Sequence, residues 1–265
     1  MENAFLIGAV IAVPAALLSA FLVLKGWALM GDAISHSVLP GIVLAYILGL
    51  PLLLGAFIAG MFAALATGYL SENSRVKPDT VMGVVFSGMF ALGVVLFVAI
   101  ETDVHLDHVL FGNLLGVGRA DLITAISIGA PVALLMILKW KDLLLHAFDP
   151  AQAQTAGLRV NWLHYGLLAA LSLTVVALLS SVGLVLAIGL LIAPGSVAFL
   201  MTRRFGAMLI VSVIICEVSV FAGIYTSFWI DSAPAPTIIL VQTLLFIAAF
   251  IFRQLQTRRM SRMTG

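Results

Sequence analysis

Asp32 and His36 are the two residues whose types and spacing best suit a metal ion. They lie four positions apart, so on a helix their side chains share one face, with Ser35 beside them. A carboxylate and an imidazole that point into one cavity are suitable ligands for Mn²⁺, Fe²⁺ or Zn²⁺. Two ligands are too few for a complete site, and a symmetric pair of subunits would bring two more to the axis.

A second interpretation of the same stretch needs no metal. Asp32 can lie at the membrane interface and cap its helix, while His36 forms an ordinary hydrogen bond to another helix. An ionised Asp within a membrane span costs roughly 2.5 to 3.5 kcal/mol, and ionisable residues there are functional candidates by default. We therefore expect a metal-binding role for the pair.

Acidic and imidazole side chains also gather between Glu101 and His108. These side chains would share one face of a strand or lie one turn apart on a helix. In either case they could receive a cation or contact a protein that delivers one. A solvated loop that starts an interfacial helix is an equally good interpretation. The residues concerned are Asp103, His105, Asp107 and His108.

The stretch from Asp149 to Gly157 predicts a short, self-contained helix. Asp149 suits the N-cap, Pro150 suits the first turn, small helix formers such as Ala153 follow, and Gly157 suits the left-handed position after the C-terminus. Such a helix could transmit force from a soluble partner or serve only as a surface connector.

Glu217 stands alone in an apolar segment, where a transport-pathway residue and a structural hydrogen bond are equally compatible with the sequence. The sequence has no GxxxxGK[ST] phosphate loop, no HExxH motif and no GxSxG elbow. We therefore expect a transport function rather than an enzyme, with any ATP hydrolysis in another chain.

The elements that must position these residues are membrane helices. Of the 265 residues, 63% are hydrophobic and only 9% are charged, which excludes a soluble domain, and barrel-type alternation is absent. We predict an all-α, polytopic membrane helix bundle that forms one unit over residues 1–265. The approximate spans are 4–24, 28–49, 51–70, 80–100, 121–138, 162–182, 184–201, 207–229 and 236–252. A re-entrant pair at Pro51 or Gly183 would reduce the nine spans to eight.

The charged residues predict an orientation. Lys and Arg lie in alternate connections, and apart from Arg119 the opposite connections lack them. The positive-inside rule then gives an external N-terminus, an external loop at about 101–120, a cytoplasmic segment at about 142–160 and a cytoplasmic C-terminus. The formal net charge is only +1, so we expect no nucleic-acid partner.

Two of the predicted spans contain a Pro-Gly pair, at Pro40-Gly41 and at Pro194-Gly195. We expect each pair to break its helix, either because an interrupted helix lines a substrate site or because it provides a packing kink.

The chain resembles the membrane permease subunit of the manganese, iron and zinc ABC importers along nearly its whole length. The residues that carry the resemblance are 25–37, Phe148-Asp149-Pro150 with Ala153 and Gly157, and 223–227 with Asp231, Pro234 and Pro236.

The resemblance implies a multi-pass protein of a bacterial inner membrane. Its partners would be a second permease chain, identical or paralogous, two cytoplasmic ATP-binding subunits and an extracytoplasmic metal-binding protein. Asp32 and His36 match the family's metal-coordinating positions, Phe148 to Gly157 matches its coupling segment, and the stretch Asp103–His108 is most like the iron and manganese branch. No permanently bound cofactor is implied, because Mn²⁺, Fe²⁺ or Zn²⁺ is the cargo. A gradient-driven metal transporter or channel with the same two ligands is the alternative.

Overall fold

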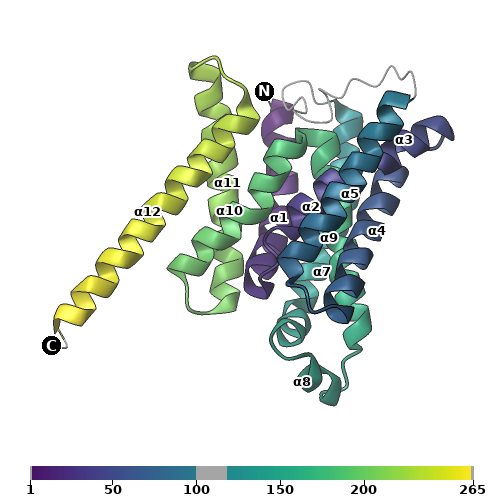
Figure 1. Ribbon diagram of the computed structural model, residues 1–265. Helices are drawn as coiled ribbons and strands as arrows, with labels where there is room; N and C mark the ends of the chain where they lie inside the picture. The colour runs from purple at the N-terminus through teal and green to yellow at the C-terminus, as the bar shows by residue number, and fades with distance from the viewer. Residues whose placement is uncertain (1, 100–117, 264–265) are drawn as a thin grey trace.

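The chain forms a bundle of helices in a computed structural model that describes residues 2–99 and 118–263 (Figure 1). No strand occurs among these residues, which confirms the predicted all-α class. The helices are α1 (Glu2–Lys25), α2 (Met30–Ser37), α3 (Leu39–Ile47), α4 (Leu52–Asn73), α5 (Pro78–Ala99), α7 (Arg119–Phe148), α8 (Pro150–Thr155), α9 (Val160–Val182), α10 (Leu184–Met201), α11 (Phe205–Trp229) and α12 (Pro234–Met263).

Nine helical segments of the described chain are long and apolar enough to cross a membrane, as predicted. Both tight junctions separate complete helices, because α4 begins after Pro51 and α10 begins after Gly183. Gly183 has φ +81°, a conformation that residues other than Gly rarely adopt, so it ends α9 abruptly. The arrangement with eight spans is therefore not found.

Two helices continue well beyond the predicted spans. Helix α7 runs to Phe148 instead of 138, and α12 runs to Met263 instead of 252. Polar residues such as Lys139 and Asp142 end the apolar run, yet their backbone stays helical and their side chains form an i,i+3 ion pair at 3.0 Å. In both cases the apolar run therefore ends before the helix does.

Only one of the two Pro-Gly pairs interrupts its helix. Helix α2 ends at Ser37 and α3 begins at Leu39, with Pro40 in the first turn of α3, where its missing N–H costs least. Helix α10 continues through Pro194, so the break expected there is wrong. Instead, the N–H of Gly195 donates to Ser19 Oγ of α1 at 2.9 Å, which makes this pair a packing contact.

Helix α1 lies at the centre of the core. It packs against α7, α10 and α11, segments that are far from it in the sequence. Fully buried Ala residues let the neighbouring backbones approach closely. They are Ala12, Ala15, Ala16 and Ala20. Ser212 Oγ of α11 also donates to the carbonyl oxygen of Ala16 at 3.0 Å.

Helices α3 and α4 make the closest backbone contact in this part of the bundle. A Cβ added at Gly41 would overlap the carbonyl oxygen of Gly55, and a Cβ at Gly55 would overlap that of Gly41. Ala45 and Ala59 lie one turn further along the same contact. This small-xxx-small pattern fixes the direction of α3 after the break at Val38.

We expect Gly41→Ala to destabilise the protein, because the methyl group would meet backbone rather than a flexible side chain. Overpacking of this kind costs about 1–3 kcal/mol. Gly166→Ala in α9 is the matched control, since nothing lies within 4 Å of its added Cβ and Ala is the better helix former. Thermal unfolding in detergent, followed by near-UV circular dichroism, should show a lower Tm for the first variant only. A raised Tm for both variants would mean that the two backbones are not in contact.

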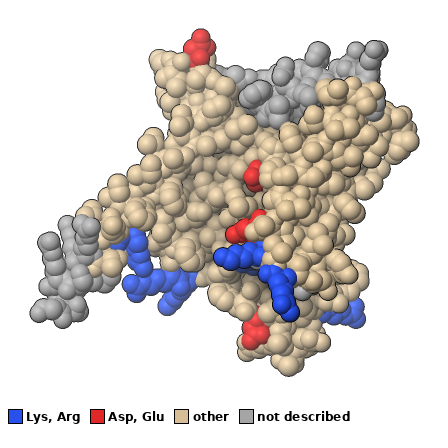
Figure 2. Space-filling view, viewed as in Figure 1, with Lys and Arg blue, Asp and Glu red and all other residues tan. Residues whose placement is uncertain are grey.

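The two ends of the bundle differ in charge. Figure 1 places the N-terminus at one end and α8 with the C-terminus at the other. On the face shown in Figure 2, Lys and Arg gather at the end that carries α8, and an uncharged surface covers most of the rest. The alternation of basic connections in the sequence therefore corresponds to one physical end of the molecule.

Candidate functional site

Asp32 and His36 face each other on α2. Asp32 Oδ1 lies 3.3 Å from His36 Nε2, and their side chains are 31% and 24% exposed. Two ligands bound about 2.1 Å from one ion at this separation would subtend about 100° at the metal, which lies between octahedral and tetrahedral geometry. The shared helical face predicted from the spacing is present, and the two donor atoms point to one position at the surface of the single chain.

Two aromatic residues of α5 hold the imidazole in place. The ring centroid of His36 lies 5.4 Å from that of Phe86 and 5.3 Å from that of Phe90. Its Nδ1 is buried without a hydrogen-bond partner among the described residues, so Nε2 is the nitrogen available beside Asp32. Sequence reasoning missed both Phe residues, and their i,i+4 spacing in an apolar span is the only signal that could have found them.

The capping interpretation does not fit α2. Its N-cap is Leu29, which makes no side-chain capping bond, and Asp32 is the third residue of the helix, with its carboxylate beside His36. Ser35 does not join the pair as expected. Its hydroxyl donates to the carbonyl oxygen of Gly31 at 2.7 Å and is buried within the bundle.

One copy of the chain offers few ligands. Among the residues that the structure describes, no group of three or more His, Cys, Asp or Glu side chains could hold a metal ion together. A complete coordination sphere at Asp32 and His36 would therefore need donors from outside the described residues.

Helix α8 has the caps that its sequence predicts. Asp149 Oδ1 accepts the N–H of Gln152 at 2.9 Å, and Pro150 occupies the first turn. Gly157 has φ +80°, its N–H donates to the carbonyl of Gln154, and the N–H of Leu158 donates to that of Ala153. These two bonds form a Schellman motif, so the helix is fixed at both ends by local chemistry.

Helix α8 and the preceding Phe148 have both buried and exposed side chains. Ala153 is fully buried, whereas Phe148, the last residue of α7, is 68% exposed although it is aromatic. In Figure 1, α8 extends beyond the ends of the long helices. An exposed aromatic beside a rigid helix is typical of a contact surface for another protein.

The whole sequence matches known proteins of one kind. A family model described as the ABC 3 transport family covers residues 1–253. The chain belongs to this family. The chelated iron transport system membrane protein YfeD of Yersinia pestis is 52% identical over 267 residues, covering 100% of this chain and 90% of that protein. The manganese transport system membrane protein MntB of Synechocystis is 44% identical over 249 residues, covering 94% and 81% respectively.

A solved structure gives the same fold. PsaBC from Streptococcus pneumoniae in complex with Fab superimposes with a TM-score of 0.83 at 34% identity, covering 94% of this chain and 90% of that one. Family membership therefore agrees with the bundle of nine candidate spans in the described chain and with the absence of enzyme motifs from the sequence.

Glu217 does not join the pair on α2. Glu217 lies on α11, which packs on α1, α10 and α12, whereas α2 packs on α4, α5, α9 and α10. Its Oε2 is buried without a hydrogen-bond partner among the described residues. The predicted external cluster lies outside the described residues. It comprises Asp103, His105, Asp107 and His108.

Proposed function

We propose that this chain, a membrane permease of the iron and manganese ABC transporter type, carries Fe²⁺ or Mn²⁺ into a bacterial cell through Asp32 and His36. Relatives whose names state iron or manganese transport, and which match nearly the full chain, support this cargo. Carboxylate and imidazole ligands suit both ions, and Zn²⁺ is the competitor to test.

The observation that carries the proposal is the geometry of the α2 pair. Its two donor atoms lie 3.3 Å apart and are partly exposed on a single chain. A second permease chain that approached this face would add an equivalent pair and complete a four-ligand site. The partner can be identical or a paralogue, provided that it presents a carboxylate and an imidazole.

The energy for transport would come from ATP hydrolysed in two partner subunits at the basic end of the bundle, which the positive-inside rule makes cytoplasmic. Helix α8 and Phe148 are exposed there. His146, two residues before Phe148, has its Nε2 3.4 Å from Lys25 Nζ at the end of α1. This contact links the α8 region to the short connection that leads into α2, and so to the metal ligands.

In this proposal an extracytoplasmic protein delivers the metal, and the site opens alternately to either side as the ATPases move α8. A gradient-driven metal transporter is the second candidate. It would use the same α2 pair but would have no need of a capped, protruding helix.

Uptake of radioactive Mn²⁺ or Fe²⁺ into proteoliposomes tests the proposal. The vesicles contain this chain with its candidate permease partner and ATPases, and uptake is competed with each unlabelled cation. We expect uptake to require ATP on the side of the membrane that α8 faces. We also expect unlabelled iron and manganese to be the strongest competitors. If uptake persists without ATPases and follows an ion gradient, the chain is a gradient-driven transporter and not an importer subunit.

A further inference from the structure

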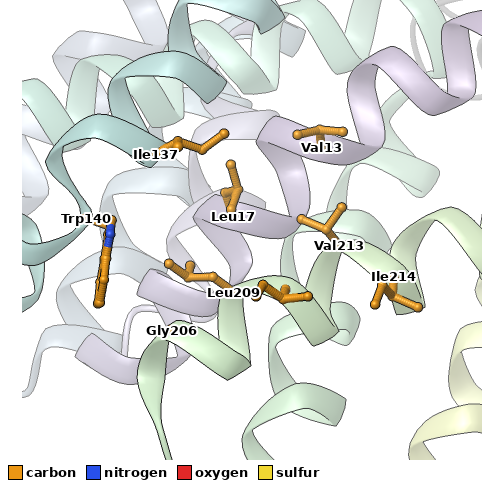
Figure 3. Close-up of a pocket in the computed structure, with 9 residues that line it drawn as sticks. Val13, Leu17, Ile137, Trp140, Gly206, Leu209, Val213 and Ile214 are labelled. Carbon is orange, nitrogen blue, oxygen red and sulfur yellow. The ribbon is translucent and has the colours of Figure 1, made fainter.

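An apolar groove of about 570 Å³ lies between α1, α7 and α11. Figure 3 shows Trp140 and Gly206 at one end of it and Val13 and Val213 at the other. The nine lining residues are apolar apart from the indole of Trp140. Gly206 leaves space at the Trp140 end, where an added Cβ would be in van der Waals contact with the indole at 3.6 Å.

The groove is about as deep as one membrane leaflet. Along α11 it runs from Gly206 to Ile214, which is about 12 Å at the rise of an α-helix. Half of a hydrocarbon core of roughly 30 Å is about 15 Å. A membrane helix from another subunit would need a groove through the full thickness, whereas one lipid tail needs only this depth.

Basic residues neighbour Trp140 and the start of α11 at this end of the groove. Arg203 and Arg204 are exposed and immediately precede α11, and Trp140 stacks on Phe205 at a centroid distance of 6.4 Å, which brings α7 beside them. Lys141 lies 5.6 Å from the Trp140 ring centroid. Among the described residues these three cations form no ion pair, while the nearby Lys139 is paired with Asp142 at 3.0 Å. The rim therefore carries a net positive charge at the level where Trp residues usually meet the headgroups.

The groove is not on the face of the metal ligands. It is built from α1, α7 and α11, whereas α2 packs mainly on α4, α5, α9 and α10. A second permease chain that completed the Asp32 and His36 site would therefore leave the groove facing lipid.

We infer that the groove binds one acyl chain of an anionic phospholipid from the cytoplasmic leaflet, with the lipid phosphate at Arg203 and Arg204. Only the orientation of the bundle is taken from the proposed function. The apolar lining holds the tail, and the basic rim selects the headgroup charge. The first N–H groups of α11, which follow Arg204, add further donors toward the phosphate.

Native mass spectrometry of the full chain, delipidated in detergent and titrated with lipid, tests the inference. The probes are phosphatidylglycerol and phosphatidylcholine with identical acyl chains. We expect one saturable phosphatidylglycerol per chain and much weaker binding of phosphatidylcholine. Equal binding of both lipids would overturn the headgroup selection.

Two variants test the location of the lipid. Ile210→Trp places a large side chain in the groove from a position that is 64% exposed, and it should remove the bound phosphatidylglycerol. Val218→Trp, 52% exposed on the same helix but outside the groove, is the matched control and should retain it. Equal retention by both variants would overturn the inference.

The rim is tested separately, with surface substitutions that leave the groove intact. Arg203→Gln combined with Arg204→Gln should weaken phosphatidylglycerol binding about 30-fold at low salt, since each basic residue near the membrane contributes about a fivefold gain. Lys77→Gln, which removes an exposed basic residue outside the rim, is the control and should leave phosphatidylglycerol binding unchanged. If Ile210→Trp instead releases a co-purified subunit from the transporter, the groove is a protein interface and the inference is wrong. Neither metal nor ATP is present, so these results are independent of metal uptake.

Discussion

Asp32→Asn is expected to reduce ATP-driven uptake of Fe²⁺ or Mn²⁺ at least about 100-fold. Removing a hydrogen-bond partner of a metal ligand typically costs 10- to 100-fold in affinity or activity, so loss of the ligand itself should cost more. Asn keeps the size of the side chain and can still contact His36, but it removes the negative charge that offsets a divalent cation in a membrane. Initial rates of radiometal uptake into proteoliposomes measure the effect.

Asp79→Asn is the matched control. Asp79 is also an acid in the first turn of a membrane helix, α5, and is exposed. The same chemical change at this position should leave uptake within about twofold of the wild-type rate, since a surface substitution away from a site changes stability by about 0.5 kcal/mol or less. Both variants should reach the membrane in equal amounts, which immunoblotting of membrane fractions checks. Normal uptake by Asp32→Asn would remove the pair from the metal path.

The sequence was informative wherever a structure depends on local chemistry. The number of spans follows from the length of apolar runs, and the ends of α8 follow from Asp149, Pro150 and Gly157, each of which satisfies backbone groups within a few positions. The contact between Asp32 and His36 is equally local, because four residues of helix bring the two side chains together.

The parts that sequence reasoning missed depend on packing between distant segments. Apart from their i,i+4 spacing, nothing in the apolar span around Phe86 and Phe90 distinguishes them from neighbours that face lipid, yet they flank His36. The same applies to Gly195, whose Pro-Gly pair predicts a break but whose N–H reaches Ser19 on α1. A Pro in a membrane helix is tolerated when neighbouring groups satisfy the backbone, and only the three-dimensional structure shows which neighbours do so.

Phe148→Ala is expected to lower ATP-driven uptake about tenfold at limiting ATPase concentration. The side chain is 68% exposed beside α8, so its loss leaves the core of the permease unchanged, while truncation of an aromatic anchor in an interface commonly costs more than 1 kcal/mol. A loss of about 1.4 kcal/mol is a tenfold change in affinity for the partner. Titration of the ATPase against uptake rate measures the shift, and excess ATPase should restore the rate.

Phe228→Ala provides the control, because Phe228 is exposed to a similar extent, 64%, near the opposite end of the bundle. It should have no effect on the ATPase titration. If Phe148→Ala and Phe228→Ala behave alike while Asp32→Asn abolishes uptake, the α2 pair carries metal without an ATPase acting on Phe148. That combination would favour a gradient-driven transporter, because the ligands would be essential and the coupling surface would not.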